Sequence, residues 1–187
     1  MISVFNSDSA FTDGVTLHSW FLFNFPITLG GQSIASEVLR KSPDFADELG
    51  PFVVEAIRSR LGLYEVVNGT PDSCVLKELL TDEKILLNQA LETPPGNIAL
   101  IRVMKISGKQ YAFGDTNEFP AEHKATIQGM VSQKMTSFFP ENSPRKSYET
   151  MMRLAGPYWF SIVANEYRGE ILDPDHYLSY YKSGHSL

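Results

Sequence analysis

LGLYEVVNGTPDSCVLKELLTDEKILLNQALETPPGNIALIRVMKISGKQYAFG, residues 61–114, is the stretch of the chain that decides the fold. Five runs in it are rich in the apolar, β-branched and aromatic residues that favour strands, namely 61–67, 73–80, 83–91, 97–106 and 109–114. The residues between these runs favour reversal of the backbone: Asn68-Gly69-Thr70-Pro71-Asp72, Thr81-Asp82, Pro94-Pro95-Gly96 and Ser107-Gly108. The pattern predicts a five-stranded antiparallel sheet or small barrel.

The run 98–106 is almost continuously apolar, so we expect it to lie centrally in the sheet. Its two charged residues are Arg102 and Lys105. A charge in a central strand must reach water or a carboxylate. We therefore expect the Arg102 stem to pack against apolar neighbours, with its guanidinium at the rim of the sheet.

The chain before the sheet predicts a helical hairpin. Gly30-Gly31 turns the chain, and Ser33 is placed to cap a helix that runs to about Lys41. Ser42 and Pro43 then open a second helix, in which Gly50-Pro51 predicts a kink or a division into two short helices. Further upstream, the alternate positions Phe21, Phe23 and Phe25 would share one face of a strand and belong to the core.

The chain after the sheet predicts a helical group. Residues 115–118 are interpreted as a loop, because Asp and Asn are ordinary turn residues. A helix over 121–139 follows, with an inward stripe of Ile127, Met130, Val131, Met135 and Phe138. Further helices are expected from Ser143, across 158–168 and near 173–184. The fold class is therefore α+β, with a first domain over 1–114 and a helical region over 115–187 that is either separate or packed on the same core.

Several segments carry a family resemblance: Trp20 with its aromatic run, Gly31-Gln32-Ser33 opening a helix, and the runs GLYEVVN, VLKELLTDEK and GNIALIRVMKI. Together they resemble the uncharacterised domain found upstream of SEC-C zinc motifs in bacterial proteins, over about residues 16–114. The resemblance implies a strand at 63–67, a hairpin at 76–83 and a further strand at 96–103. Glu78 stands where that domain usually has Asp, and the SEC-C motif itself is absent because Cys74 is the single cysteine. The resemblance therefore implies a fold but no zinc site and no activity.

Composition and charge exclude several classes of function. The net charge is −6 and no dense basic patch is present, which argues against binding to nucleic acid. The first basic residue of the 187 is Arg40, so the amino terminus lacks the positive region of a secretory signal. The most apolar run, 20–27, is too short to span a membrane. Cys74 alone can form no internal disulfide. These features predict a cytoplasmic protein without membrane contact.

No motif in the sequence defines an active site, and no cofactor is implied. If the protein is a hydrolase or transferase, its site would assemble from distant residues at the junction of sheet and helices, for which we nominate Arg102, Asp115, Glu118 and His123. Asp173, Asp175 and His176 are close enough in sequence to touch one cation. Helix capping and solvent exposure explain these three with fewer assumptions.

The leading hypothesis is a non-enzymatic, cytoplasmic binding or adaptor protein of bacterial or phage origin, with an unknown protein partner. It rests on a well-patterned fold that has no catalytic cluster. The alternatives are the enzyme described above and a protein that binds nucleic acid on the face of the sheet. The helix near the carboxyl terminus carries Tyr177, Tyr180 and Tyr181, which either pack on the same chain or form a homodimer contact.

Overall fold

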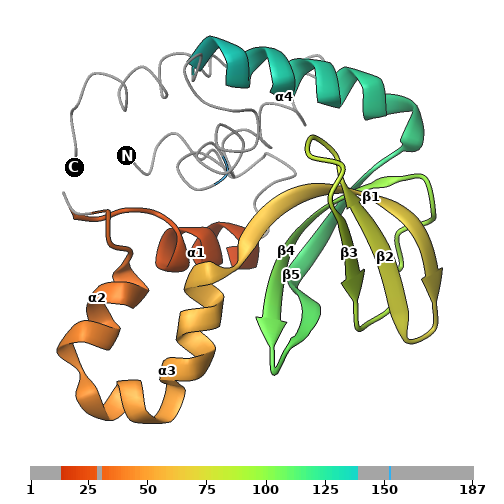
Figure 1. Cartoon of the computed structure of the whole chain (residues 1–187). Coiled ribbons are helices and arrows are strands. Elements are labelled where there is room, and N and C mark those ends of the chain that lie inside the picture. Colours follow the sequence, from red (N-terminus) through yellow and green to blue (C-terminus); the bar gives the residue numbers. More distant parts are fainter. Residues whose placement is uncertain (1–13, 29–30, 139–151, 153–187) are drawn as a thin grey trace.

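The protein combines a closed five-stranded barrel with helices, as seen in the computed structural model (Figure 1). The structure describes residues 14–28, 31–138 and 152. The strands are β1 (Arg60–Thr70), β2 (Ser73–Glu78), β3 (Lys84–Leu87), β4 (Ile98–Ile106) and β5 (Lys109–Phe119). The prediction of an α+β fold with a small five-stranded barrel is confirmed.

The strands follow the order β1-β2-β3-β5-β4 around the barrel, and β4 closes it by pairing with β1. Every pairing is antiparallel except that of β3 with β5, which is parallel and joins Leu87 to Gln110. The prediction of an entirely antiparallel sheet was therefore wrong. The long connection between β3 and β4 separates these two strands, so β3 meets β5 instead. Side-chain amides complete this seam, since Asn88 Oδ1 accepts from the Gln110 N–H at 3.0 Å.

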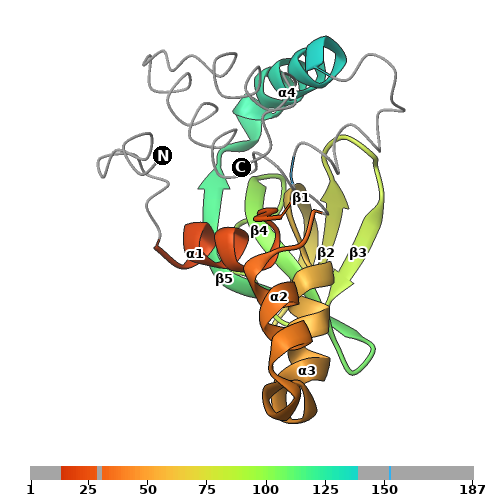
Figure 2. The ribbon, with the colours of Figure 1, turned by 90° about the vertical axis from the view of Figure 1, so that its left-hand side faces the viewer.

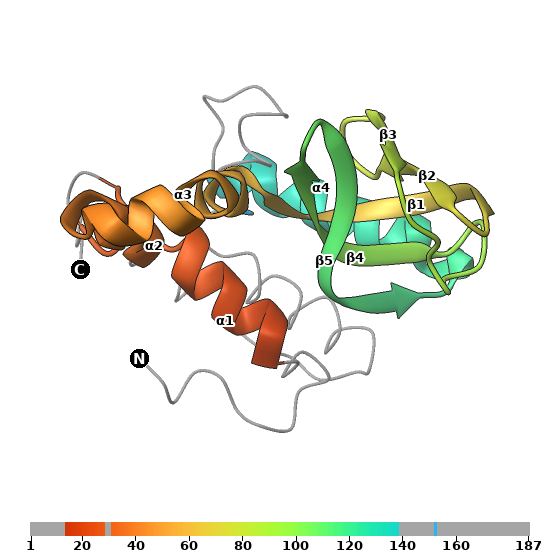
Figure 3. The same ribbon diagram turned by 90° about the horizontal axis from the view of Figure 1, so that it is seen from below.

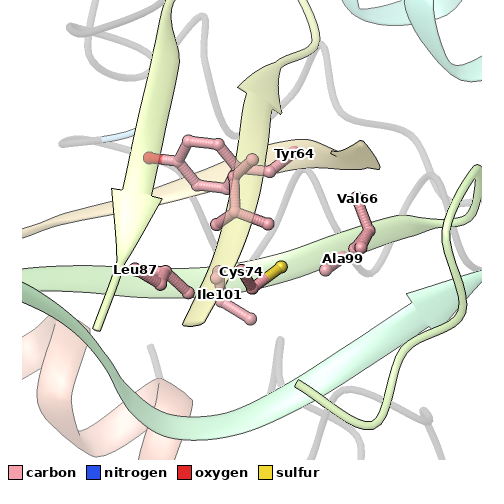
Figure 4. Close-up of a cluster of buried hydrophobic side chains, with 7 residues drawn as sticks. Tyr64, Val66, Cys74, Leu87, Ala99 and Ile101 are labelled. Carbon is pink, nitrogen blue, oxygen red and sulfur yellow. The ribbon is translucent and has the colours of Figure 1, made fainter. Parts of the chain in front are cut away.

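Among the described residues, buried apolar clusters lie on both faces of the barrel wall. The interior core consists of Tyr64, Val66, Cys74, Leu76, Leu87, Ala99 and Ile101, and Figure 4 shows six of these side chains converging from different strands. On β4 the side chains alternate between faces, so Met104 lies outside the barrel and packs with Phe23, Ala35, Val53 and Ala56 of the helices. Burial raises the pKa of the Cys74 thiol, as expected for a structural cysteine.

In the part of the chain that the structure describes, three helices precede the barrel: α1 (Gly14–Phe23), α2 (Ile34–Lys41) and α3 (Pro43–Arg58). The last two pack side by side as the predicted hairpin (Figure 2). The strand expected around Phe21 was wrong, because α1 is helical there: Phe21 is 42% exposed while Phe23 is buried. Helical spacing points Phe21 and Phe23 in different directions, whereas the rings of Phe21 and Phe25 stack with their centroids 5.5 Å apart.

Helix α3 continues through Gly50-Pro51 as one helix, so the division into two helices was wrong. Proline at position 51 removes the hydrogen bond to the carbonyl of Asp47, four residues earlier. Asp47 is an exposed residue, so water can reach that carbonyl. Gly50 itself is buried, and a side chain there would meet Ala46 and Leu39, which shows how closely α2 and α3 approach.

Ser33 and Ser42 were both predicted as helix caps, but they differ in their capping hydrogen bonds, and this difference can be tested. The Ser33 hydroxyl accepts from the Ser36 N–H at 3.3 Å, whereas the Ser42 side chain makes no capping bond. Ser33→Ala is expected to lower the free energy of unfolding by about 1 kcal/mol. Ser42→Ala is the matched control and should change it much less. Urea denaturation of both variants measures the difference, and equal losses would contradict the assignment of Ser33 as the functional cap.

After the barrel, a short 3-10 helix η2 (Ala121–His123) leads into α4 (Lys124–Phe138). Ile127, Val131 and Met135 are buried, as the predicted stripe requires. Lys124 Nζ lies 2.7 Å from Glu65 Oε2, and Gln128 Nε2 donates to the Leu79 carbonyl at 2.6 Å. These contacts hold α4 across the barrel at the end away from the β4–β5 hairpin tip (Figures 1 and 3).

Residues 115–118 belong to β5, so the predicted loop was wrong. Gly114 adopts a φ of 86° beside the register shift opposite Leu100, and the strand resumes its pairing with β4 after it. The helices expected from Ser143, over 158–168 and near 173–184 lie outside the described residues, apart from residue 152. Among the helices that the structure describes, none has both the length and the apolar character needed to cross a bilayer.

Candidate functional site

The most unusual polar side chain among the described residues is that of Arg102, which lies at the junction between α3 and β1. Arg102, on the outer face of β4, is only 2% exposed. Its Nη1 donates to Asn24 Oδ1 at 2.6 Å and to Ser59 Oγ at 3.0 Å. Asn24 follows α1, and Ser59 lies between α3 and β1. The side chain therefore connects β4 with the residue after α1 and with the junction between α3 and β1. We had expected the guanidinium at the rim of the sheet, and this prediction was wrong.

The neighbours of Arg102 are themselves fixed by hydrogen bonds. Asn24 Nδ2 donates to the carbonyls of Ile57 and Ser59, at 3.4 and 3.3 Å. The Ser59 hydroxyl donates to the Ala56 carbonyl in the last turn of α3. Because both partners are held by backbone groups, they present their oxygens to Arg102 in a fixed orientation.

Arg102 has no carboxylate partner among the described residues, and its Nε and Nη2 have no hydrogen-bond acceptor there. Burial lowers its pKa to about 10, so the group is still a cation at neutral pH. A buried cation is ordinarily paired, because removing it from water costs several kcal/mol. Within the described part of the chain, the junction therefore carries a positive charge without a counter-ion and two N–H groups without an acceptor.

A cavity of about 440 Å³, called here the basic cavity, opens at this junction. Its polar lining comes from Asn24, Ser33, Ser36, Arg58, Ser59 and Arg60. Ser33 and Ser36 belong to the amino-terminal turn of α2, so the positive end of that helix dipole is at the cavity wall. Both charged residues of the described lining are arginines, which makes the cavity a positive site in an acidic protein.

A larger depression of about 1110 Å³, called here the α3 groove, lies on the other side of the same junction. Phe52 of α3 and Ile106 of the β4–β5 hairpin line it and are 42% and 39% exposed. Tyr64, Ile85 and Val103 belong to, or pack against, the interior core, so the groove reaches the mouth of the barrel. Arg58, Ser59 and Arg60 border both the α3 groove and the basic cavity.

The barrel mouth contains two buried ionisable side chains that the sequence did not single out as a site. Tyr64 and Glu78 are opposite each other on β1 and β2, and are 2% and 5% exposed. Burial raises the pKa of the Tyr64 hydroxyl well above its usual range, and the nearby Glu78 carboxylate adds to the shift. Tyr64 therefore stays neutral and can act as a hydrogen-bond donor but not as a base.

The nominated catalytic residues engage different partners. Arg102 bonds to Asn24 and Ser59, whereas the Glu118 carboxylate accepts from the Asn97 side chain. His123 Nε2 lies 3.2 Å from Glu122 Oε1. Asp115 is a residue of strand β5. The structure thus does not bring Arg102 and Glu118 together.

The nominated metal ligands Asp173, Asp175 and His176 lie outside the described residues, as do Tyr177, Tyr180 and Tyr181. Within the described part of the chain, no group of three or more His, Cys, Asp or Glu side chains is placed to hold a metal ion.

One signal in the sequence points to the Arg102 network. Asn24 interrupts the apolar run 20–27, and Arg102 interrupts the apolar strand 97–106. Polar residues inside two apolar runs are often buried partners of each other, because each needs a hydrogen bond. Ser59 carries no such signal, since a serine at a helix end is common.

Comparison with protein-family models, with curated proteins and with solved structures gives no match. The resemblance to the domain upstream of SEC-C motifs therefore stays a prediction.

Proposed function

We propose that this protein is a non-enzymatic, cytoplasmic binding or adaptor protein that takes an apolar segment of a protein partner into the α3 groove. The observation that carries the proposal is the pair Phe52 and Ile106, two large apolar side chains that line the groove and are 42% and 39% exposed. Exposed apolar side chains gathered in a depression are typical of interaction sites.

The geometry of the groove supports an anchored segment rather than a flat contact. Its floor at Ile85 and Val103 continues into the apolar interior of the barrel. A partner side chain placed there would lose most of its contact with water, which is how binding hot spots form. The strands close into a small barrel, a scaffold that often serves as a binding module, and we infer a similar use here.

The alternatives have less support. A hydrolase or transferase would need its nominated groups in contact, and Arg102 and Glu118 hydrogen-bond to different residues. A protein that binds nucleic acid would need a continuous basic face, whereas Lys77 on β2 and Lys124 at the start of α4 are paired with Asp82 and Glu65. The homodimer through Tyr177, Tyr180 and Tyr181 remains a second prediction about partners.

The α3 groove is tested by a charge placed in it. Ile106→Glu is expected to reduce capture of the partner at least tenfold in a tagged pull-down from the native host, because a carboxylate in an apolar contact must be desolvated. Ile106 is partly exposed, so the fold should tolerate the change. Native mass spectrometry of the eluate identifies the partner and any bound small molecule.

Leu86→Glu is the matched control for this experiment. Leu86 is also a strand residue, is 54% exposed and does not line the α3 groove. Its variant should capture the partner as well as the original protein does. Equal capture by the Ile106→Glu variant would exclude the groove, and turnover of a small molecule by the pure protein would favour the enzyme.

A further inference from the structure

We propose that the basic cavity binds a phosphate group, either free or carried by a small ligand. This site is separate from the docking of a partner in the α3 groove. It assigns a ligand to the part of the junction that contains the α2 amino terminus and the Arg102 network. Three independent observations support it.

The first observation is the orientation of α2. Its amino-terminal turn contributes Ser33 and Ser36 to the cavity lining, together with Gly31, which adopts a φ of 76° just before the helix. The unpaired N–H groups of a first turn and the helix dipole both favour an anion. Glu37 is the acidic residue of this turn, and its carboxylate is held by Arg40 at 2.8 Å and Lys41 at 3.5 Å. Glu37 is not among the residues that line the cavity, so this pairing lies outside the site.

The second observation is Arg102. It is only 2% exposed, and its Nε and Nη2 lack acceptors among the described residues. Its Nη1 rests on Asn24 Oδ1 and Ser59 Oγ, and both of those residues line the cavity. Arg102 itself does not line the cavity, and its guanidinium is connected to the lining through Asn24 and Ser59. In this poorly solvated position its charge acts on the cavity with little screening.

The third observation is the charge of the lining. Arg58 and Arg60 are the charged residues of the described lining, and no acidic residue accompanies them there. Arg58 also forms an ion pair with Glu55 at 3.3 Å, but the two side chains are 71% and 32% exposed. An exposed pair of this kind contributes little, so Arg58 can turn to a ligand at small cost.

Together these groups match the chemistry of phosphate. Arginine and helix N–H groups neutralise its charge, and one hydroxyl of the hydrogen-bonded pair Ser33 and Ser36 can donate to a remaining oxygen. Burial of the Arg102 charge without a carboxylate is costly to the free protein. A bound anion would supply the missing counter-charge, so binding should also stabilise the fold.

Isothermal titration with inorganic phosphate tests the proposal, against sodium chloride at the same ionic strength. We expect saturable binding by the original protein and a higher melting temperature with phosphate. Arg58→Gln should weaken binding about tenfold, as expected for loss of one charge-assisted hydrogen bond. Arg40→Gln is the matched control, because Arg40 also ends a helix and pairs with a glutamate three residues earlier. It should change the affinity less than twofold.

Asn24→Asp provides a second variant of nearly the same shape. It places a carboxylate beside Arg102 in the cavity wall, so phosphate binding should be lost while circular dichroism shows an intact fold. Ile106→Glu should bind phosphate normally, which separates failure of this proposal from failure of the α3 groove. The proposal is overturned if phosphate acts no differently from chloride, if Arg40→Gln weakens binding as much as Arg58→Gln, or if a folded Asn24→Asp variant binds unchanged.

Discussion

Gly62→Ala is expected to lower the free energy of unfolding by about 2–3 kcal/mol, because it overpacks the barrel interior. A Cβ at this position would lie 2.7 Å from the Cε2, Cζ and Oη atoms of Tyr64. Gly62 and Tyr64 are two residues apart on β1 and so face the same side. The ring is 2% exposed and packed in the interior core, so it can yield only by leaving that core for the α3 groove.

Two comparisons make this prediction specific. Gly129→Ala, in α4, meets no atom within 4 Å and should stabilise the protein by about 0.5–1 kcal/mol through helix propensity. In a Tyr64→Leu background, which lacks the far ring atoms, Gly62→Ala should cost much less than in the original protein. Denaturant unfolding of the four proteins in the cycle gives the coupling. A loss at position 62 that is the same in both backgrounds would show that the Tyr64 ring is not its cause.

The same strand illustrates which parts of the fold can be predicted from local sequence. The turn between β1 and β2 and the turn between β4 and β5 were predicted because Gly, Pro, Asn and Asp act within a few residues. The start of α2 was predicted in the same way, because Ser33 is a local capping signal. The parallel contact of Leu87 with Gln110 has no local signal, since it depends on how the connection between β3 and β4 crosses the barrel. Strand β5 continues past Gly114 only because β4 offers a partner there.

The candidate site was less predictable than the fold, for the same reason. Arg102 was noted in the sequence, but its burial depends on α1 and on the α3–β1 junction, and Asn24 lies 78 residues away from it. The rule that a charged head reaches the rim of a sheet assumes that nothing covers the strand. Here the helices cover that face of β4, as the contacts of Met104 with Phe23 and Val53 show. Both cavities arise from this tertiary packing.

Asn24→Ala is expected to destabilise the protein by about 3 kcal/mol, because it removes an acceptor from a buried cation. Arg102 Nη1 would lose its 2.6 Å bond to Asn24 Oδ1 and keep those to Ser59. The carbonyls of Ile57 and Ser59 would also lose the Asn24 amide as a donor, which is the smaller loss because both groups are neutral.

Removing the Arg102 charge should remove most of the destabilisation that Asn24→Ala causes. In an Arg102→Met background, the Asn24→Ala change is expected to cost about 1 kcal/mol, since only neutral hydrogen bonds are lost. Arg102→Met alone should be tolerated, because a buried charge without a carboxylate is often replaced by an apolar side chain at little cost. Urea unfolding of the four proteins measures the coupling between the two positions, expected to be about 2 kcal/mol.

The size of that coupling decides what Arg102 contributes. A large coupling together with a stable Arg102→Met protein means that the cation destabilises the fold. It is then accommodated only because Asn24 and Ser59 accept hydrogen bonds from it. The charge then has a use other than stability, such as attracting an anion to the basic cavity. If Arg102→Met unfolds the protein while Asn24→Ala does not, the guanidinium is required as a structural tie between β4 and the helices. Additive effects at the two positions would contradict the network itself.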